Sequence, residues 1–120
     1  MVALDRIAHE QTIRSTVPEM AAHLQSLFGR RLTAAILGIA DPKAIGRYAT
    51  GGQSPQPDVE RHLRATYQVA VLLGQVESDQ AIRAWFLGMN PALDDYAPAT
   101  FIRTHPERVL QAARIFLANG

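Results

Sequence analysis

Apolar residues recur at helical spacing along almost the entire chain, which is the pattern of helices that bury one face. The clearest example lies between residues 58 and 76, where Val59, Leu63, Ala70 and Leu73 fall on one helical face. No segment alternates apolar and polar residues with the two-residue period of a half-buried strand. The pattern therefore predicts an all-α protein.

Capping residues, prolines and glycines divide this pattern into segments. Thr16-Val17-Pro18-Glu19 is a capping box with proline in the first helical turn, and Asp41-Pro42 and Ser78-Asp79 begin further helices. Gly29 and the pair Gly51-Gly52 end helices. The predicted helices are residues 16–29, 32–37, 41–51, 58–76, 78–88, 98–103 and a last one from residue 104, and residues 1–15 form a loose arm or a short helix.

The Pro-rich stretch Ser54-Pro55-Gln56-Pro57 is the best internal boundary of the chain. It separates an N-terminal lobe, residues 1–56, from a C-terminal lobe, residues 57–120. A chain of 120 residues is long enough for one domain or for two small lobes that share a core. We expect two small helical lobes.

Composition narrows the class of protein. Hydrophobic residues make up 48% of the chain, which allows a real core, and there is no cysteine, which excludes disulfides, thiolate zinc sites and cysteine nucleophiles. No run is long and apolar enough to cross a bilayer, and the N-terminus lacks a secretion signal. We expect a cytoplasmic protein without membrane contact. The net charge of +1 is too small to require a nucleic-acid partner.

Candidate catalytic groups are sparse. The histidines show no metal-ligand spacing, and no glycine-rich phosphate loop precedes a helix. The adjacent carboxylates Asp94 and Asp95 lie in a predicted turn, where neighbouring residues seldom converge on one substrate. We therefore expect no enzyme, no metal site and no cofactor.

Residues 18–52 have the outline of a helix-turn-helix, with a turn at Gly38 before the third helix. In such a unit the third helix lies in the major groove of DNA. Lys43 and Arg47 lie four residues apart on the outward face of this helix, so one can read a guanine or both can hold phosphates. The alternative is a three-helix packing unit without DNA contact.

Large apolar residues are concentrated in the C-terminal lobe. Trp85, Phe86, Met89, Leu93 and Tyr96 lie close together in the sequence, and such residue types are enriched in protein interfaces. We expect the first two to fill the core of the lobe. The other three lie in the turn that begins at Asn90-Pro91, and we expect them to be exposed for a partner.

Two groups of residues in this chain carry a resemblance to a known family. The first group is Ala84-Trp85-Phe86, then Asn90-Pro91-Ala92-Leu93, Pro98 and Val109. It resembles the toxin-binding domain of Xre/MbcA/ParS-type antitoxins. The second group is Gly38-Ile39, Ile45, Arg47-Tyr48, Gly51 and Pro55, and it is similar to the Xre-like helix-turn-helix of that family. The resemblance covers roughly residues 30–120. The chain departs from the family pattern at Asp94-Asp95-Tyr96-Ala97, where glycine and a small or polar residue are usual.

The resemblance implies a specific function. Such antitoxins are encoded beside a RES-domain toxin that destroys NAD; the antitoxin dimerises, binds the toxin and covers its NAD pocket with its C-terminal region. The complex commonly represses its own operon, so operator DNA is a further expected partner. The residues expected to contact the toxin are Met89, Asn90, Leu93, Tyr96, Arg103, Arg114, Asn119 and Gly120, and the structural core of the motif is Trp85, Phe86 and Pro98.

A second interpretation of the same sequence is a stand-alone helix-turn-helix transcriptional regulator, whose C-terminal lobe only dimerises. The two interpretations differ in the partner of the C-terminal lobe. A RES-type gene directly beside this one would favour the antitoxin.

Overall fold

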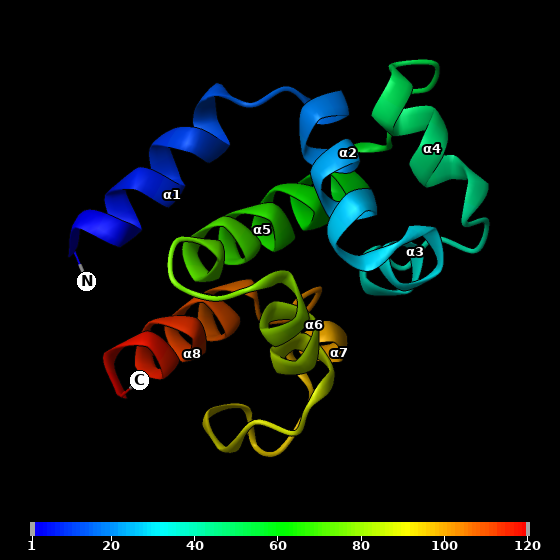
Figure 1. Ribbon diagram of the computed structural model, residues 1–120. Helices are drawn as coiled ribbons and strands as arrows, with labels where there is room; N and C mark the ends of the chain where they lie inside the picture. Colours follow the sequence, from blue (N-terminus) through cyan, green and yellow to red (C-terminus); the bar gives the residue numbers. More distant parts are fainter. Residues whose placement is uncertain (1, 120) are drawn as a thin grey trace.

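The computed structural model describes residues 2–119, which are helical as the pattern predicts (Figure 1). In this range the chain forms eight α-helices and one short 3-10 helix, and no strand. The elements in chain order are α1 (Val2–Arg14), α2 (Val17–Phe28), α3 (Arg30–Leu37), α4 (Lys43–Thr50), α5 (Pro57–Gly74), α6 (Asp79–Leu87), η1 (Pro91–Leu93), α7 (Pro98–Phe101) and α8 (Pro106–Asn119).

Helix α5 is the centre of the fold, because α1, α2 and α8 all pack against it (Figure 1). Its apolar face includes Leu63, Val69, Leu72 and Leu73, which are almost completely buried. The buried residues on both sides of the predicted boundary at residue 56 belong to one hydrophobic cluster. The molecule is therefore organised around one shared core.

Residues 2–14 form helix α1, so of the two expected alternatives, a loose arm or a short helix, the structure has the helix. Helix α1 lies antiparallel along α5, because the Leu4 carbonyl accepts a 2.9 Å hydrogen bond from Nε2 of Gln75 while Gln11 bonds the Tyr67 hydroxyl at 3.1 Å. These bonds fix both ends of α1 on the central helix.

Helices α2, α3 and α4 pack on one another in the N-terminal part of the chain. The capping box predicted for α2 is confirmed, since Glu19 accepts a 2.8 Å bond from the Thr16 amide and its own amide donates to the Thr16 hydroxyl. The bond from the Thr16 amide stabilises the ionised carboxylate and lowers the pKa of Glu19, and the Thr16 side chain acts in the same direction. The chain leaves α3 through Gly38, whose φ of 75° is in the left-handed region. The helix-turn-helix nature of this part remains a prediction.

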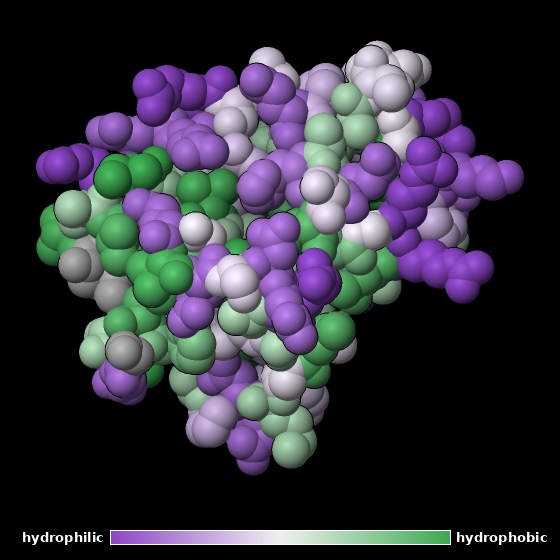
Figure 2. All heavy atoms as spheres, viewed as in Figure 1, coloured by the Kyte–Doolittle hydropathy of each residue, from purple (hydrophilic) through white to green (hydrophobic). Residues whose placement is uncertain are grey.

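The surface differs between the two ends of the molecule. Figure 2 shows apolar side chains gathered on the side where the termini and the end of α5 lie, while hydrophilic side chains project over α3 and α4. Within residues 2–119, no helix has both the length and the apolar character that a bilayer-spanning segment needs.

Candidate functional site

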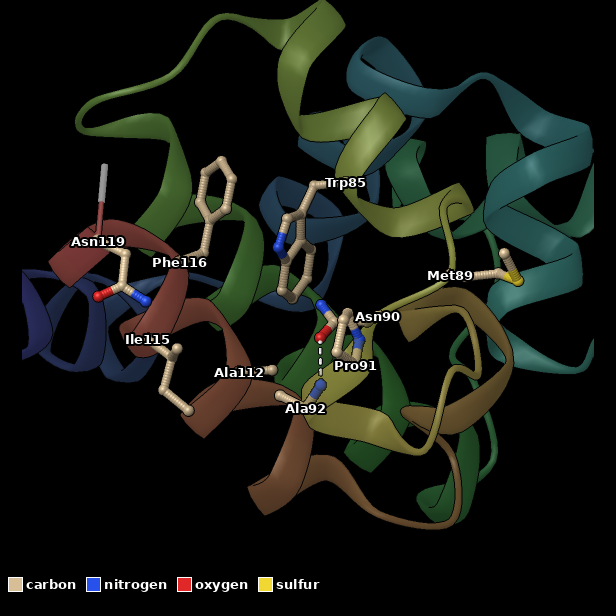
Figure 3. Close-up of a pocket in the computed structure, with 9 residues that line it drawn as sticks. All are labelled: Trp85, Met89, Asn90, Pro91, Ala92, Ala112, Ile115, Phe116 and Asn119. Carbon is tan, nitrogen blue, oxygen red and sulfur yellow. Dashed lines mark hydrogen bonds between the residues drawn. The ribbon is translucent and has the colours of Figure 1, made fainter.

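An apolar groove of about 580 Å³ lies between α6, the turn that follows it, and α8 (Figure 3). None of the residues that line it carries a charge, and the only polar side chains among them are two asparagines. The lining residues are Trp85, Met89, Asn90, Pro91, Ala92, Ala112, Ile115, Phe116 and Asn119. A surface of this composition suits the uncharged, apolar part of a partner.

One face of α8 forms a wall of the groove. Ala112, Ile115, Phe116 and Asn119 are separated by three, one and three residues, so they lie on one side of the helix. The exposed fractions of Ile115 and Phe116 are 42% and 38%, which is high for large apolar side chains. Sequence analysis identified only Asn119 on this wall, although a second apolar face on the last helix was the signal that could have revealed it.

Trp85 on α6 forms the opposite wall. Its ring centroid lies 6.3 Å from that of Phe116 and 5.3 Å from that of Phe86. Phe86 is completely buried and packs edge-on against Phe28 of α2 at 5.0 Å. The prediction that both aromatic residues fill the core is therefore confirmed for Phe86, whereas Trp85 is half-buried and shared between the core and the groove.

Asn90 organises the turn that continues the groove wall beyond Trp85. Its Oδ1 atom accepts a 3.0 Å bond from the Ala92 amide, which Figure 3 marks as a dashed line. Its carbonyl accepts bonds of 2.9 Å from the amides of both Leu93 and Asp95. Pro98, which begins α7, is buried. Asn90 therefore acts chiefly as a turn-forming residue, and its remaining amide atoms border the groove.

The expectation that Leu93 is exposed is wrong. Its side chain is completely buried, because η1 turns inward and this leucine is the element's only large apolar residue. Burial of Leu93 anchors the turn to the core. The other two turn residues are exposed as predicted, Met89 to 82% and Tyr96 to 59%. In Figure 3 the Met89 side chain points away from the rest of the groove.

Two arginines expected to contact a toxin do not line the groove. The Nε atom of Arg114 donates a 2.8 Å hydrogen bond to Oδ1 of Asp5 in α1. The guanidinium of Arg103 lies over Gly38, so closely that a Cβ atom at this glycine would collide with it. Both side chains thus contact the N-terminal half of the chain. The predicted contact Gly120 lies outside the described residues.

The predicted DNA-reading residues are exposed on α4, but one of them has partners within the chain. Nη2 of Arg47 lies 3.2 Å from Oδ2 of Asp41, and its Nε donates to Gln53 at 2.6 Å. The Lys43 amide and the Arg47 side chain lower the pKa of Asp41, so this carboxylate stays ionised beside both cations. Sequence analysis missed Arg30, whose guanidinium lies against Gly46 of α4. A glycine inside a short helix is the signal that marks such a close contact.

Among residues 2–119, no group of three histidine, aspartate or glutamate side chains is placed to hold a metal ion. Comparison of the chain with models of known families, with curated proteins and with solved structures gave no match in any of the three.

Proposed function

We propose that this protein is the antitoxin of a toxin–antitoxin pair and neutralises a RES-domain, NAD-degrading toxin by binding it and blocking its active site. The proposal starts from the resemblance of the segment from Ala84 to Val109 to the toxin-binding domain of Xre/MbcA/ParS-type antitoxins. In that family the antitoxin is a dimer, and we propose a homodimer for this chain as well.

The observation that carries the proposal is the uncharged groove between Trp85 and Phe116. Both rings belong to residue types that dominate binding energy at protein interfaces. Exposed apolar surface of this kind contributes about 25 cal/mol per Å² when a partner covers it. The Asn119 amide, at the open end of α8, adds a polar group that orients the partner. The groove supports protein binding better than catalysis, since its lining has no titratable side chain.

Inhibition on this proposal is steric. The partner's apolar surface fills the groove, and the last turn of α8 then lies at the entrance of the toxin's NAD pocket. The contacts proposed to remain available for the toxin are Met89, Tyr96 and Asn119, together with the groove walls. Arg114 and Arg103 act within the antitoxin, and Leu93 supports the turn from below.

Co-expression with the neighbouring RES-type gene product tests the proposal. The wild-type protein should co-purify with the toxin and prevent loss of NAD. Phe116→Asp should lose both effects, because it places a charge in the groove. Val76→Asp is the matched control, since Val76 is an apolar residue with 60% exposure outside the groove. Failure of the wild-type protein to bind the toxin, or equal effects of the two substitutions, would contradict the proposal.

A second proposed activity is operator binding through α4. Lys43 and Arg47 are exposed on this helix, and the guanidinium of Arg30 from α3 lies against its Gly46. This cationic surface is the specific observation that favours DNA binding, either for an autorepressing antitoxin or for a stand-alone regulator. The two differ in whether the groove binds a toxin.

A further inference from the structure

Arg108, in the first turn of α8, has contacts on several sides although it is a surface residue. Its Nη1 and Nη2 atoms donate to Oδ2 of Asp94 at 3.3 and 3.2 Å. Nη2 also donates to the carbonyl of Ala92 at 3.3 Å. Its Cζ atom lies 4.9 Å from the ring centroid of Phe101, within the range of a cation–π contact. One guanidinium thus joins α8, the turn after α6, and α7.

The turn that Arg108 holds has an unfavourable backbone conformation. Asp94 and Asp95 have φ angles of 56° and 67°, and they are the only non-glycine residues with positive φ in residues 2–119. An L side chain crowds the backbone in this left-handed region, although aspartate tolerates it better than most residues. The turn therefore needs contacts from outside to stay in this conformation.

This turn is also the part of the groove wall that does not itself belong to a long helix. Pro91 and Ala92 line the groove, and η1 packs against α8. The buried Leu93 attaches the turn to the core from one side. Arg108 attaches it to α8, the helix that carries Ile115 and Phe116 on the facing wall.

We propose that Arg108 is the positioning residue of the groove: its guanidinium fixes the turn from Asn90 to Tyr96 against the start of α8 and so sets the distance between the two walls. Lysine could keep the charge but not this set of contacts, because an ammonium group has no planar fork to cover a ring and reach two acceptors. A single exposed ion pair contributes little to global stability. The effect of Arg108 is therefore local to the turn.

The test uses the whole chain and two local readouts. The first is amide exchange at Leu93, Asp95 and Tyr96, whose N–H groups bond within the turn. The second is acrylamide quenching of Trp85, which is the only tryptophan of the chain and lines the groove. Arg108→Met should accelerate exchange at the three amides by about tenfold, with little change in α5, and should increase quenching.

Matched variants separate positioning from a general loss of stability. Asp94→Asn and Asp95→Asn change the same residue type in the same backbone conformation, but only Asp94 is held by Arg108. Asp94→Asn should accelerate exchange in the turn, and Asp95→Asn should not. Arg108→Lys should fall between wild type and Arg108→Met. Unchanged exchange in Arg108→Met, or equal acceleration in the two asparagine variants, would overturn the proposal.

Binding to the RES-type protein is a third measurement, and it is the only one that rests on the proposed function. There Arg108→Met should weaken binding about tenfold while Arg61→Met, an exposed arginine on α5, leaves it unchanged. If the wild-type protein does not bind, the proposed function fails, and the exchange measurements still decide the role of Arg108.

Discussion

Nε of Arg114 donates a 2.8 Å hydrogen bond to Oδ1 of Asp5, which joins the last helix of the described chain to the first. Both side chains are partly buried, with exposed fractions of 36% and 26%. Helices α1 and α8 each pack on α5, so this ion pair connects two helices that flank the central one (Figure 1). It holds α8 on the side away from the groove.

This ion pair should contribute measurably to stability. Arg114→Met should lower the free energy of unfolding by about 1 kcal/mol, because the pair is better shielded than a surface salt bridge. Asp5→Asn should have a similar effect, and the double variant should lose less than the sum of the two. Urea denaturation measures each value, with Arg61→Met as the control. Strict additivity would show that the two side chains do not interact in solution.

Loss of the ion pair between Arg114 and Asp5 should also loosen α1 locally. Without the ion pair, the hydrogen bond from Gln75 to the Leu4 carbonyl is the remaining polar link described near the start of α1. Amide exchange in α1 should therefore accelerate in Arg114→Met, while exchange in α2 stays the same.

His23 on α2 should make stability depend on pH. Its ring lies edge-on to Tyr67 of α5 at 5.3 Å, and the partial loss of water around the imidazole lowers its pKa, although the residue is on the surface; the charge of Asp79 acts in the opposite direction more weakly. Because the pKa is lower in the folded state, the unfolded state binds protons first as the pH falls. The contribution of His23 is complete above about pH 6.5, the ordinary pKa of histidine in an unfolded chain, and is lost as the pH falls through the folded-state pKa.

The measurement is urea denaturation at pH 7.5 and pH 5. The free energy of unfolding of the wild type should be lower at pH 5, and His23→Gln should show a smaller difference between the two conditions. His9→Gln is the control, because His9 is likewise on the surface, on α1, whereas it is His23 whose ring packs against Tyr67. A pH dependence that is identical in the wild type and His23→Gln would contradict the assignment.

Glycine substitutions should separate backbone strain from side-chain contact in the turn. Asp95→Gly should stabilise the protein by about 0.5 kcal/mol, because glycine adopts a φ of 67° without a steric penalty. Asp94→Gly gains the same relief but removes the ion pair with Arg108, so its net effect should be smaller or destabilising. Thermal unfolding of the two variants measures the difference. Equal melting temperatures would mean that the Arg108 ion pair contributes nothing to stability.

The helices could be predicted from the sequence, whereas the conformation of this turn could not. The helix periods and capping residues predicted α2 to α8 closely, because each signal is local to its own segment. Burial of Leu93 could not be predicted in this way, since an isolated leucine among polar neighbours has no period. Whether it faces solvent or the core depends on where the turn packs. The positive φ of Asp94 and Asp95 likewise goes with the hydrogen bonds of Asn90 and the contact of Asp94 with Arg108, and these contacts are known only from the structure.

The candidate site was predicted only in part, because some of its residues are placed by contacts between distant parts of the sequence. Met89, Asn90 and Asn119 were expected to contact a partner and do line the groove. Trp85 was expected in the core, and it lines the groove as well. Arg114 was expected to face a partner, but it pairs with a residue 109 positions away, and no local pattern indicates a contact over such a separation. Charged residues near a predicted interface can therefore belong to the fold.

Asp41 provides the sharpest test of DNA binding. Its carboxylate pairs with Arg47 and accepts a bond from the Lys43 amide, so it reduces the positive charge of α4 where a phosphate would approach. Asp41→Asn should therefore tighten binding to the DNA upstream of the gene, whereas Lys43→Ala with Arg47→Ala should weaken it. The double variant should also reduce the slope of log K against log salt by about one for each phosphate that the protein no longer neutralises. Fluorescence anisotropy at several salt concentrations measures both effects.

Because one variant should bind DNA more tightly and the other more weakly, a general loss of folding cannot explain both results. Helix α4 lies far from α8, which carries one wall of the groove (Figure 1), so the same variants should keep their affinity for the RES-type protein. Anisotropy that is unchanged in both variants would show that α4 does not contact DNA. In that case the N-terminal helices would serve the core alone, and the stand-alone regulator would lose its only supporting surface, because its activity requires the DNA contact that the antitoxin can do without.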